Sequence, residues 1–445
     1  MAGFGRVRRT IESALGRIAE HDEGMKAFLT VDAEGARAAA EVLDHLPPRG
    51  PLHGLPVAIK DLTDTAGLRT TYGSALFAQN VPASDDLIVA RLRAAGAIIL
   101  GKTMTPEFGF GALCRNPLGG PTANPWQTDL TSGGSSGGAA VAVATGMVPL
   151  AHGTDFGGSV RTPASFCGVL SIRPTPGVLP NPARALGYDM LSTTGFLARS
   201  VAMLTRALKV TAGPDALDPL SISLPKASVA LPEGPLRIAV TDDFGTAPVA
   251  EGVRERLRAA VGAIPPDLGT LTTATPDCID AYDIFHTLRP ALIRRQFGPL
   301  MEKFGDDLTQ TVRWWIDRGA GISAADFLAA EAGRTALARR FVRLFEHFDV
   351  LIAPAASVMP WPNSLPEVTD IDGKALATIV DYLAVTFIVT LAGCPVVTLP
   401  APLGGEKLPF GIQLIGPPGS DYRLLRIAAR FEKAGFRFVP PPRYR

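Results

Sequence analysis

The chain has 445 residues, of which 47% are hydrophobic and 19% are charged, a composition that excludes a disordered protein. Lys and Arg number 43 against 42 Asp and Glu, so the near-zero net charge excludes a global field that would attract nucleic acid or an anionic membrane. We therefore expect a globular protein that acts on a small molecule, with no nucleic acid and no membrane among its partners, and with a homodimer left open.

The first 21 residues lack the apolar core of a secretory signal, and the longest apolar stretch, 139–151, is interrupted by Gly146 and Pro149. These features predict a cytoplasmic protein. The cysteines are far apart in sequence, as expected for reduced thiols rather than for disulfides or a zinc site. They are Cys114, Cys167, Cys278 and Cys394.

The first half of the chain alternates helical and strand patterns. An amphipathic helix is expected over 34–46, a short strand over 57–59, a helix over 85–96 and a strand over 97–100. A Gly/Ser-rich stretch, TSGGSSGGAA at 131–140, leads into a small-residue helix over 138–145 and then into an apolar run, 147–151. This alternation predicts an α/β fold with a single large mixed, mostly parallel β-sheet covered by helices on both faces. Ligands of such sheets bind at the carboxyl ends of strands, where Lys60, Lys102 and Ser159 are expected.

The second half of the chain begins with a weakly patterned segment over about 213–280 and becomes helical over 284–348. Apolar runs at 350–354, 395–402 and 410–416 predict further strands of the same sheet. We expect one domain over 1–445. It consists of a core over about 50–210, a variable helical region over about 213–348 that supplies the substrate pocket, and C-terminal strands over about 349–445.

Two short motifs have the spacing of known functional loops but lack the preceding strand that those loops require. GAIILGKT at 96–103 has the spacing of a phosphate-binding loop, but a helix pattern precedes Gly96 where that loop requires a strand. GGSSG at 133–137 has the spacing of a nucleophile elbow, but a proline-rich segment precedes it instead of a strand. The downstream His286 and His347 lie in helical patterns and are interpreted as structural.

A combination of one lysine and two serines gives a better hypothesis. A serine hydroxyl is a poor nucleophile until a base removes its proton, and neither serine loop has a histidine beside it. Lys60 at the end of an apolar strand is a candidate base, because burial lowers the pKa of an amine. The glycines of DFGGS before Ser159 allow backbone N–H groups to approach an oxyanion closely, although an ordinary tight turn explains them equally well.

Three blocks resemble the amidase signature family of Ser-cisSer-Lys hydrolases. They are GLPVAIKD, TSGGSSGG and GTDFGGSVR, with a looser likeness in the C-terminal strands. The resemblance implies that Ser159 is the nucleophile, that Ser135 bridges it to the base after a cis peptide bond, and that Lys60 is the base. It also implies an oxyanion hole made by the N–H groups of four residues. These are Phe156, Gly157, Gly158 and Ser159.

Neighbouring residues are expected to support the site. Asp155 and Arg161 brace the loops, and Ser136 forms a hydrogen bond within the site. Asp61, next to Lys60, either tunes the lysine electrostatically or caps local backbone, and Glu107 is interpreted as structural. The sequence departs from the family pattern outside the three blocks, which leaves the substrate open. The departures are Met104, Ser171, Arg173, Val178 and Phe196.

The resemblance implies an amidase that hydrolyses a linear carboxamide through a serine acyl-enzyme, without cofactor or metal, and releases ammonia or an amine. Two alternatives stay open. One is a glutaminase like the A subunit of an amidotransferase, which acts in a tRNA-dependent complex, and the other is a binding protein that has lost catalysis.

Overall fold

The computed structural model describes residues 5–224, 231, 234–365 and 367–445. Its helices are α1 (Arg6–Met25), α2 (Ala33–Asp44), α3 (Leu87–Ala94), α4 (Gly137–Ala144), α5 (Arg161–Cys167), α6 (Val201–Thr211), α7 (Glu251–Gly262), α8 (Ala281–Phe304), α9 (Gln310–Arg318), α10 (Ala324–His347), α11 (Ala384–Leu391) and α12 (Asp421–Lys433). Short 3₁₀ helices are η1 (Ala75–Phe77), η2 (Glu107–Gly109), η4 (Gly305–Asp307), η5 (Asp381–Leu383) and η6 (Pro442–Tyr444).

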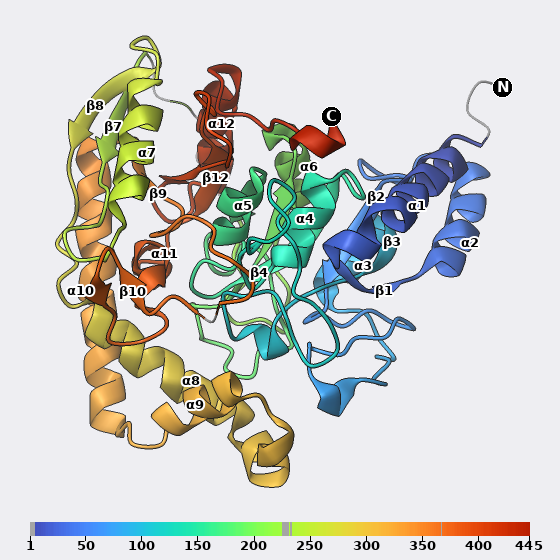
Figure 1. Ribbon diagram of the computed structural model, residues 1–445, viewed down its shortest axis with the longest axis horizontal. Helices are drawn as coiled ribbons and strands as arrows, with labels where there is room; N and C mark the ends of the chain where they lie inside the picture. Colours follow the sequence, from blue (N-terminus) through green and yellow to red (C-terminus); the bar gives the residue numbers. More distant parts are fainter. Residues whose placement is uncertain (1–4, 225–230, 232–233, 366) are drawn as a thin grey trace.

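One large sheet crosses the molecule from β1 on the N-terminal side to β8 (Figure 1). Its eleven strands run in the order β1 (Phe28–Val31), β3 (Ile98–Thr103), β2 (Pro56–Lys60), β4 (Leu150–Asp155), β6 (Thr193–Ala198), β5 (Leu170–Arg173), β12 (Val396–Pro400), β13 (Gly411–Ile415), β9 (Val350–Pro354), β7 (Leu236–Val240) and β8 (Gly269–Thr273). A separate pair is formed by β10 (Asp370–Ile371) and β11 (Lys374–Ala375).

The sheet is mixed. Parallel pairs form two blocks, β3–β2–β4 near one edge and β9–β7–β8 at the other, while the strands between them pair antiparallel. The predicted α/β fold with one large mixed sheet is confirmed. Its centre is more antiparallel than the βα alternation suggests, because β5 and β6 pair antiparallel with each other and the later strands β12 and β13 join them by antiparallel pairing.

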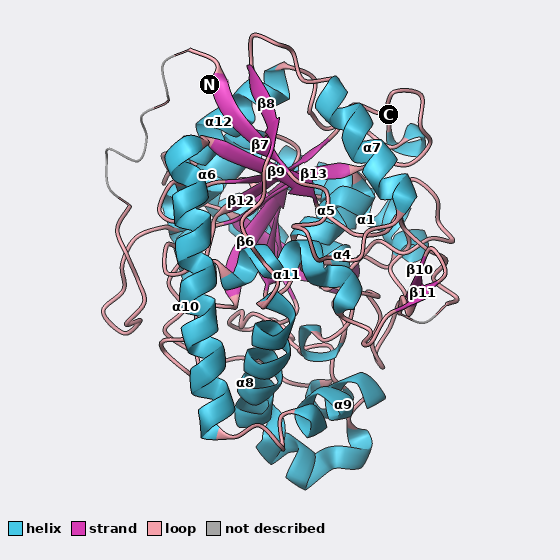
Figure 2. Ribbon diagram, turned by 90° about the vertical axis from the view of Figure 1, so that its left-hand side faces the viewer, coloured by secondary structure: helices cyan, strands magenta, loops and turns pink. Residues whose placement is uncertain are grey.

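Helices cover both faces of the sheet, and neighbouring strand residues point to opposite cores. In β2, Val57 and Ile59 pack into one hydrophobic core, while Ala58 packs into the other. Ile98 and Ile99 of β3 divide in the same way. The core containing Ala58 includes α1, α2, α4 and α5, and the core containing Val57 includes α3, α6 and α12. Figure 2 shows the strands enclosed between helices, with α8 and α9 extending beyond them.

Most predicted elements of the first half lie where the pattern placed them. The small-residue helix expected over 138–145 is α4, in which every residue is buried. The strand expected over 97–100 continues to Thr103, and the strand after α4 begins at Leu150 rather than at 147. The sequence analysis did not identify several elements, namely α1, β1, α5, β5, β6, α6, β7, α7, β8, β10, β11, α11 and α12. Residues 225–230 and 232–233 of the predicted variable region lie outside the described residues.

Candidate active site

The parallel pairing of β2 with β4 brings two of the predicted site segments to one edge of the sheet. Val57 pairs with Leu150 and Ala58 with Ala151, so Lys60 at the end of β2 lies beside the last residues of β4. The loop that carries Ser159 begins directly after β4, and the loop that carries Ser135 leads into α4. Both strands end at the carboxyl edge, where ligands of α/β sheets bind.

Lys60 is fully buried and surrounded by hydroxyl groups. Its Nζ lies 2.7 Å from Ser135 Oγ, 2.9 Å from Ser136 Oγ and 3.0 Å from Thr154 Oγ1. Burial lowers the pKa of Lys60 to about 7, because the ammonium loses its hydration, and the negative charge of Asp155 opposes this only in part. An amine that titrates near neutrality beside a hydroxyl is able to accept a proton from it.

Ser135 is held in the position that the family resemblance implies. The peptide bond between Gly134 and Ser135 is cis, and the Ser135 side chain is almost fully buried. Gly134 is required at this point, since a Cβ there would lie 2.9 Å from the backbone of Ala112. The N–H of Ser136 donates to the carbonyl of Ser159 at 3.1 Å, so a backbone hydrogen bond joins the two serine loops.

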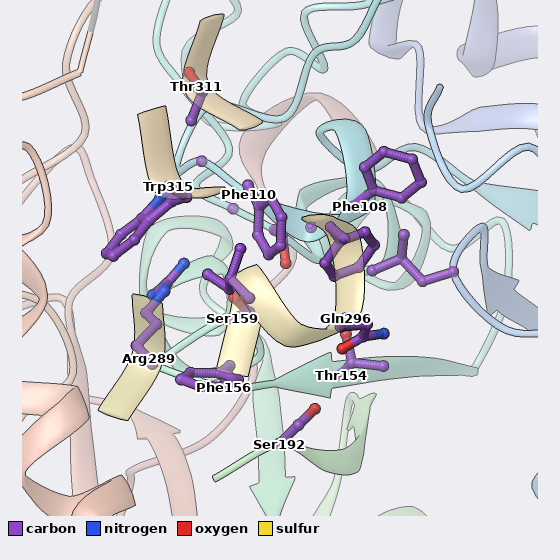
Figure 3. Close-up of a pocket in the computed structure, with 18 of the residues that line it drawn as sticks. Phe108, Phe110, Thr154, Phe156, Ser159, Ser192, Arg289, Gln296, Thr311 and Trp315 are labelled. Atoms are coloured by element: carbon purple, nitrogen blue, oxygen red, sulfur yellow. The ribbon is translucent and has the colours of Figure 1, made fainter. Parts of the chain in front are cut away.

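Ser159 points into the cavity that Ser135 also lines (Figure 3). Its side chain is partly exposed, in contrast to Ser135. Among the residues that the structure describes, the Ser159 hydroxyl has no hydrogen-bond partner. The structure therefore joins Lys60 to Ser135 directly and places Ser159 on the same cavity, without a hydrogen bond between the two serines.

Asp155 organises the loop that follows β4. Its carboxylate accepts the N–H groups of Gly158 at 3.0 Å and Val160 at 3.1 Å, and it pairs with Arg161 at 2.7 Å. Burial raises the pKa of Asp155, but the charges of Arg161 and Arg173 outweigh burial and hold it well below its usual range. Asp155 and Arg161 do not line the cavity, consistent with the bracing role expected from the sequence.

The hydrogen bonds of this loop reduce the set of N–H groups expected to form an oxyanion hole. The N–H of Gly158 is occupied by Asp155, whereas those of Phe156, Gly157 and Ser159 have no partner in the described part of the chain. Gly158 has φ +121°, and a Cβ on it would lie 2.5 Å from Thr386 Oγ1. Only glycine fits at this position.

The other motifs have structural roles. Gly96 follows α3, and Lys102 is buried in β3, where its Nζ donates to Thr70 Oγ1 at 2.7 Å, so no phosphate loop forms. Glu107 accepts hydrogen bonds from Ser74 Oγ at 2.5 Å and from the N–H of Thr309 at 2.8 Å. Asp61 accepts the N–H of Thr71 at 3.0 Å.

The cavity has a volume of about 480 Å³, and aromatic side chains form much of its wall. They include Phe77, Phe108, Phe110, Phe156, Phe297 and Trp315. Arg289 and Gln296 from α8 also line it, and Figure 3 shows them with Trp315 around Ser159. The sequence analysis named none of these side chains from α8 and α9. It predicted only that the helical region supplies the pocket, because apolar and charged residues on a long helix have no distinguishing spacing.

Comparison with known proteins identifies the class. Residues 9–425 match the family described as Amidase, so the chain belongs to the amidase family, and the resemblance found in the sequence is confirmed. The protein is an enzyme of this family.

Individual members of the family show which proteins this chain resembles. The chain is 35% identical to the glutamyl-tRNA(Gln) amidotransferase A subunit of Thermus thermophilus, over 95% of this chain and 93% of the relative. It resembles the structure of a bacterial aryl acylamidase of the amidase signature family, with 26% identity, a TM-score of 0.89, and coverage of 98% and 94% of the two chains. The structure of the glutamyl-tRNA(Gln) amidotransferase A subunit from Thermotoga maritima gives 26% identity and a TM-score of 0.78, with coverage of 98% and 94%.

These relatives correct the expectation about partners. The sequence analysis expected a small-molecule partner and no nucleic acid. That expectation is wrong, because the curated relatives are named as one subunit of an amidotransferase whose name includes a tRNA. A near-zero net charge describes one chain and carries no information about what a partner subunit binds. Within the described residues, no helix is long and apolar enough to cross a membrane.

Proposed function

We propose that this chain is the amide-hydrolysing subunit of an amidotransferase, which releases ammonia from an amide donor for transfer to an acyl group carried by a tRNA. The 35% identity to an amidotransferase A subunit over 95% of the chain supports the assembly. The contact of 2.7 Å between Lys60 Nζ and Ser135 Oγ is the observation that supports amide hydrolysis. The cytoplasmic setting expected from the sequence belongs to this proposal.

In the proposed reaction, neutral Lys60 takes the proton of Ser135 while Ser135 takes the proton of Ser159. Ser159 Oγ then forms a bond to the carbonyl carbon, and the carbonyl electrons move onto oxygen. The free N–H groups of Gly157 and Ser159 stabilise that oxyanion. When the carbonyl re-forms, the C–N bond breaks and the proton returns through Ser135 to the leaving nitrogen, which departs as ammonia. Water then hydrolyses the acyl-enzyme by the same proton path.

The nucleophile is tested by labelling with a fluorophosphonate followed by mass spectrometry. We expect the wild type to take one label on Ser159, and Ser159→Ala to take none and to lose amide hydrolysis. Ser192→Ala is the matched control, because Ser192 lines the same cavity, and this variant is expected to be labelled like the wild type. Full labelling of Ser159→Ala would remove Ser159 from this role.

A second candidate is an amidase that acts alone. The higher TM-score with the aryl acylamidase, 0.89 against 0.78 for the amidotransferase subunit, favours it. The two functions are separated by measuring ammonia release from the purified chain, with and without candidate partner subunits and glutamyl-tRNA. Amide hydrolysis that is rapid alone and unchanged by partners supports the independent amidase, whereas formation of amidated tRNA that requires this chain supports the amidotransferase.

A further inference from the structure

A second hollow, separate from the active-site cavity, lies at the opposite end of strands β2 and β4. It has a volume of about 450 Å³ and is lined by α1, by Leu55 and Pro56 at the start of β2, and by residues 146–149 before β4. Lys60 ends the same strand, roughly 13 Å from Pro56 at about 3.3 Å per residue. A ligand in the second hollow would therefore bind apart from the predicted catalytic residues.

Arginines supply all the charge in the wall of the second hollow. Among the described residues that line it, four carry a guanidinium group and none carries a carboxylate. They are Arg6, Arg9 and Arg17 on α1, and Arg199 directly after β6. The three arginines of α1 share one face of the helix, because their spacings of three and eight residues are close to whole turns. Positive charge thus enters the hollow from two separate segments of the chain.

Two of these arginines meet above Gly146. A Cβ added to Gly146 would lie 2.7 Å from Arg199 Nη2 and 3.4 Å from Arg17 Nη1. Arg17 Nη1 donates to the carbonyl of Gly146 at 2.9 Å. Arg199 donates to the carbonyls of Val143 at 2.7 Å and Ala144 at 3.1 Å, at the end of α4. These bonds use only part of the five N–H donors of each guanidinium. Burial, and after it the charge of Arg17, lowers the pKa of Arg199 to about 10, so the two like charges disfavour each other.

The other two arginines, Arg6 and Arg9, have exposed side chains. Within the part of the chain that the structure describes, neither side chain forms an ion pair or a hydrogen bond. The nearby carboxylates are engaged elsewhere. Asp44 accepts two backbone N–H groups of α1 at 2.8 and 3.0 Å and pairs with Arg8 at 3.6 Å. Its charge also acts on Arg9, but Asp44 does not line the hollow. Glu12 pairs with an arginine of α2 at 2.7 Å. The positive charge in the wall is therefore not neutralised there.

We propose that the second hollow binds the phosphate group of a small phosphorylated molecule. Guanidinium groups enter it from two directions, and a phosphate monoester offers three oxygens that accept hydrogen bonds from such donors. A carboxylate has two oxygens in one plane, which a single arginine fork satisfies. The cations surround one hollow instead of following a track along the surface, which favours a small ligand over the backbone of an RNA. This binding is independent of the proposed amide hydrolysis.

The test is isothermal titration calorimetry of the whole chain with inorganic pyrophosphate, at constant ionic strength and in a buffer without other phosphates. The double variant Arg6→Gln, Arg9→Gln is expected to raise the Kd by about tenfold or more, because it removes two charge-assisted contacts. Both side chains are exposed and make no contact that stabilises the fold, so the thermal midpoint without ligand is expected to stay unchanged. Arg8→Gln is the matched control, since Arg8 lies in the same turn of α1 but outside the hollow. Its Kd is expected to stay within about twofold of the wild type.

Several results would overturn the proposal. Absence of both heat and thermal stabilisation at about 10 mM pyrophosphate would mean that the hollow takes no phosphate. An equal loss of affinity in Arg8→Gln would indicate a diffuse positive field, and citrate binding as tight as that of pyrophosphate would indicate carboxylate ligands. Loss of pyrophosphate binding in Arg289→Met would place the anion in the active-site cavity. If the double variant weakens tRNA binding by the assembled complex but leaves pyrophosphate binding unchanged, the hollow contacts RNA instead.

Discussion

Acidification is expected to stop amide hydrolysis by protonating Lys60. Burial lowers the pKa of Lys60 from 10.5 to about 7. At pH 7, about half of the molecules therefore carry a neutral amine, against about one in 3,000 for an exposed lysine. A base must be neutral to accept a proton, so activity rises with pH through the pKa. Below it, kcat/KM falls about tenfold per pH unit, which gives a loss of about 100-fold at pH 5.

The assay is ammonia release over pH 5–9 at constant ionic strength, with stability checked at each pH by recovery of activity after return to pH 8. The dependence of kcat/KM on pH reports the pKa values of ionisable groups in the free enzyme, and Lys60 is the group expected to titrate. Lys60→Met is expected to lose about 10²–10⁴-fold in rate, the range for a general base, and to lose the acid limb as well. Thr154→Val is expected to move the limb to lower pH, since it removes one acceptor at 3.0 Å that stabilises the ammonium.

A flat profile between pH 6 and 8 in the wild type would refute this reasoning. Retention of the acid limb in Lys60→Met would also do so, because another group would then be titrating. Either result would require a different base for Ser135, although the geometry around Lys60 would stand.

Two further predictions concern packing around the site. Asp155→Asn leaves Arg161 buried without its counter-charge and is expected to cost about 3–5 kcal/mol of unfolding free energy in urea; a loss below 1 kcal/mol would contradict it. Gly138→Ala in α4 places a Cβ 2.5 Å from the backbone nitrogen of Met104 and is expected to cost about 1–3 kcal/mol, measured by thermal unfolding. Gly16→Ala, in α1 with open space around it, is the control and is expected to stabilise, so equal effects would refute the packing argument.

The sequence was sufficient to locate those candidate site residues whose spacing and neighbours are distinctive. Lys60 is the last residue of a short apolar strand, and Ser135 and Ser159 lie in glycine-rich loops next to α4 and β4. The family resemblance added the cis bond before Ser135, which the structure contains. The catalytic roles of these residues stay predictions until they are tested.

The sequence alone predicted neither the side chains that line the pocket nor the order of the strands in the sheet. Arg289 and Trp315 lie on different helices and meet only because α8 packs against α9. In the sequence each looks like an ordinary helix residue. The strand β8 was not predicted because it is mostly exposed, with little alternation of apolar and polar side chains. Pairing partners depend on contacts between distant segments, which local patterns do not encode.

The attachment of Arg161 has a consequence for biosynthesis. Arg161 Nη1 donates to the carbonyl of Thr386 at 2.7 Å and to Gln413 Oε1 at 3.0 Å, so the support of the Ser159 loop comes from segments 225 and 252 residues further along the chain. A nascent chain that ends before Thr386 already contains Lys60, Ser135 and Ser159. It still lacks Thr386 and Gln413, whose hydrogen bonds with Arg161 hold the loop in shape. The Ser159 loop is therefore expected to take its final shape only after the segment that contains Thr386 and Gln413 has been synthesised.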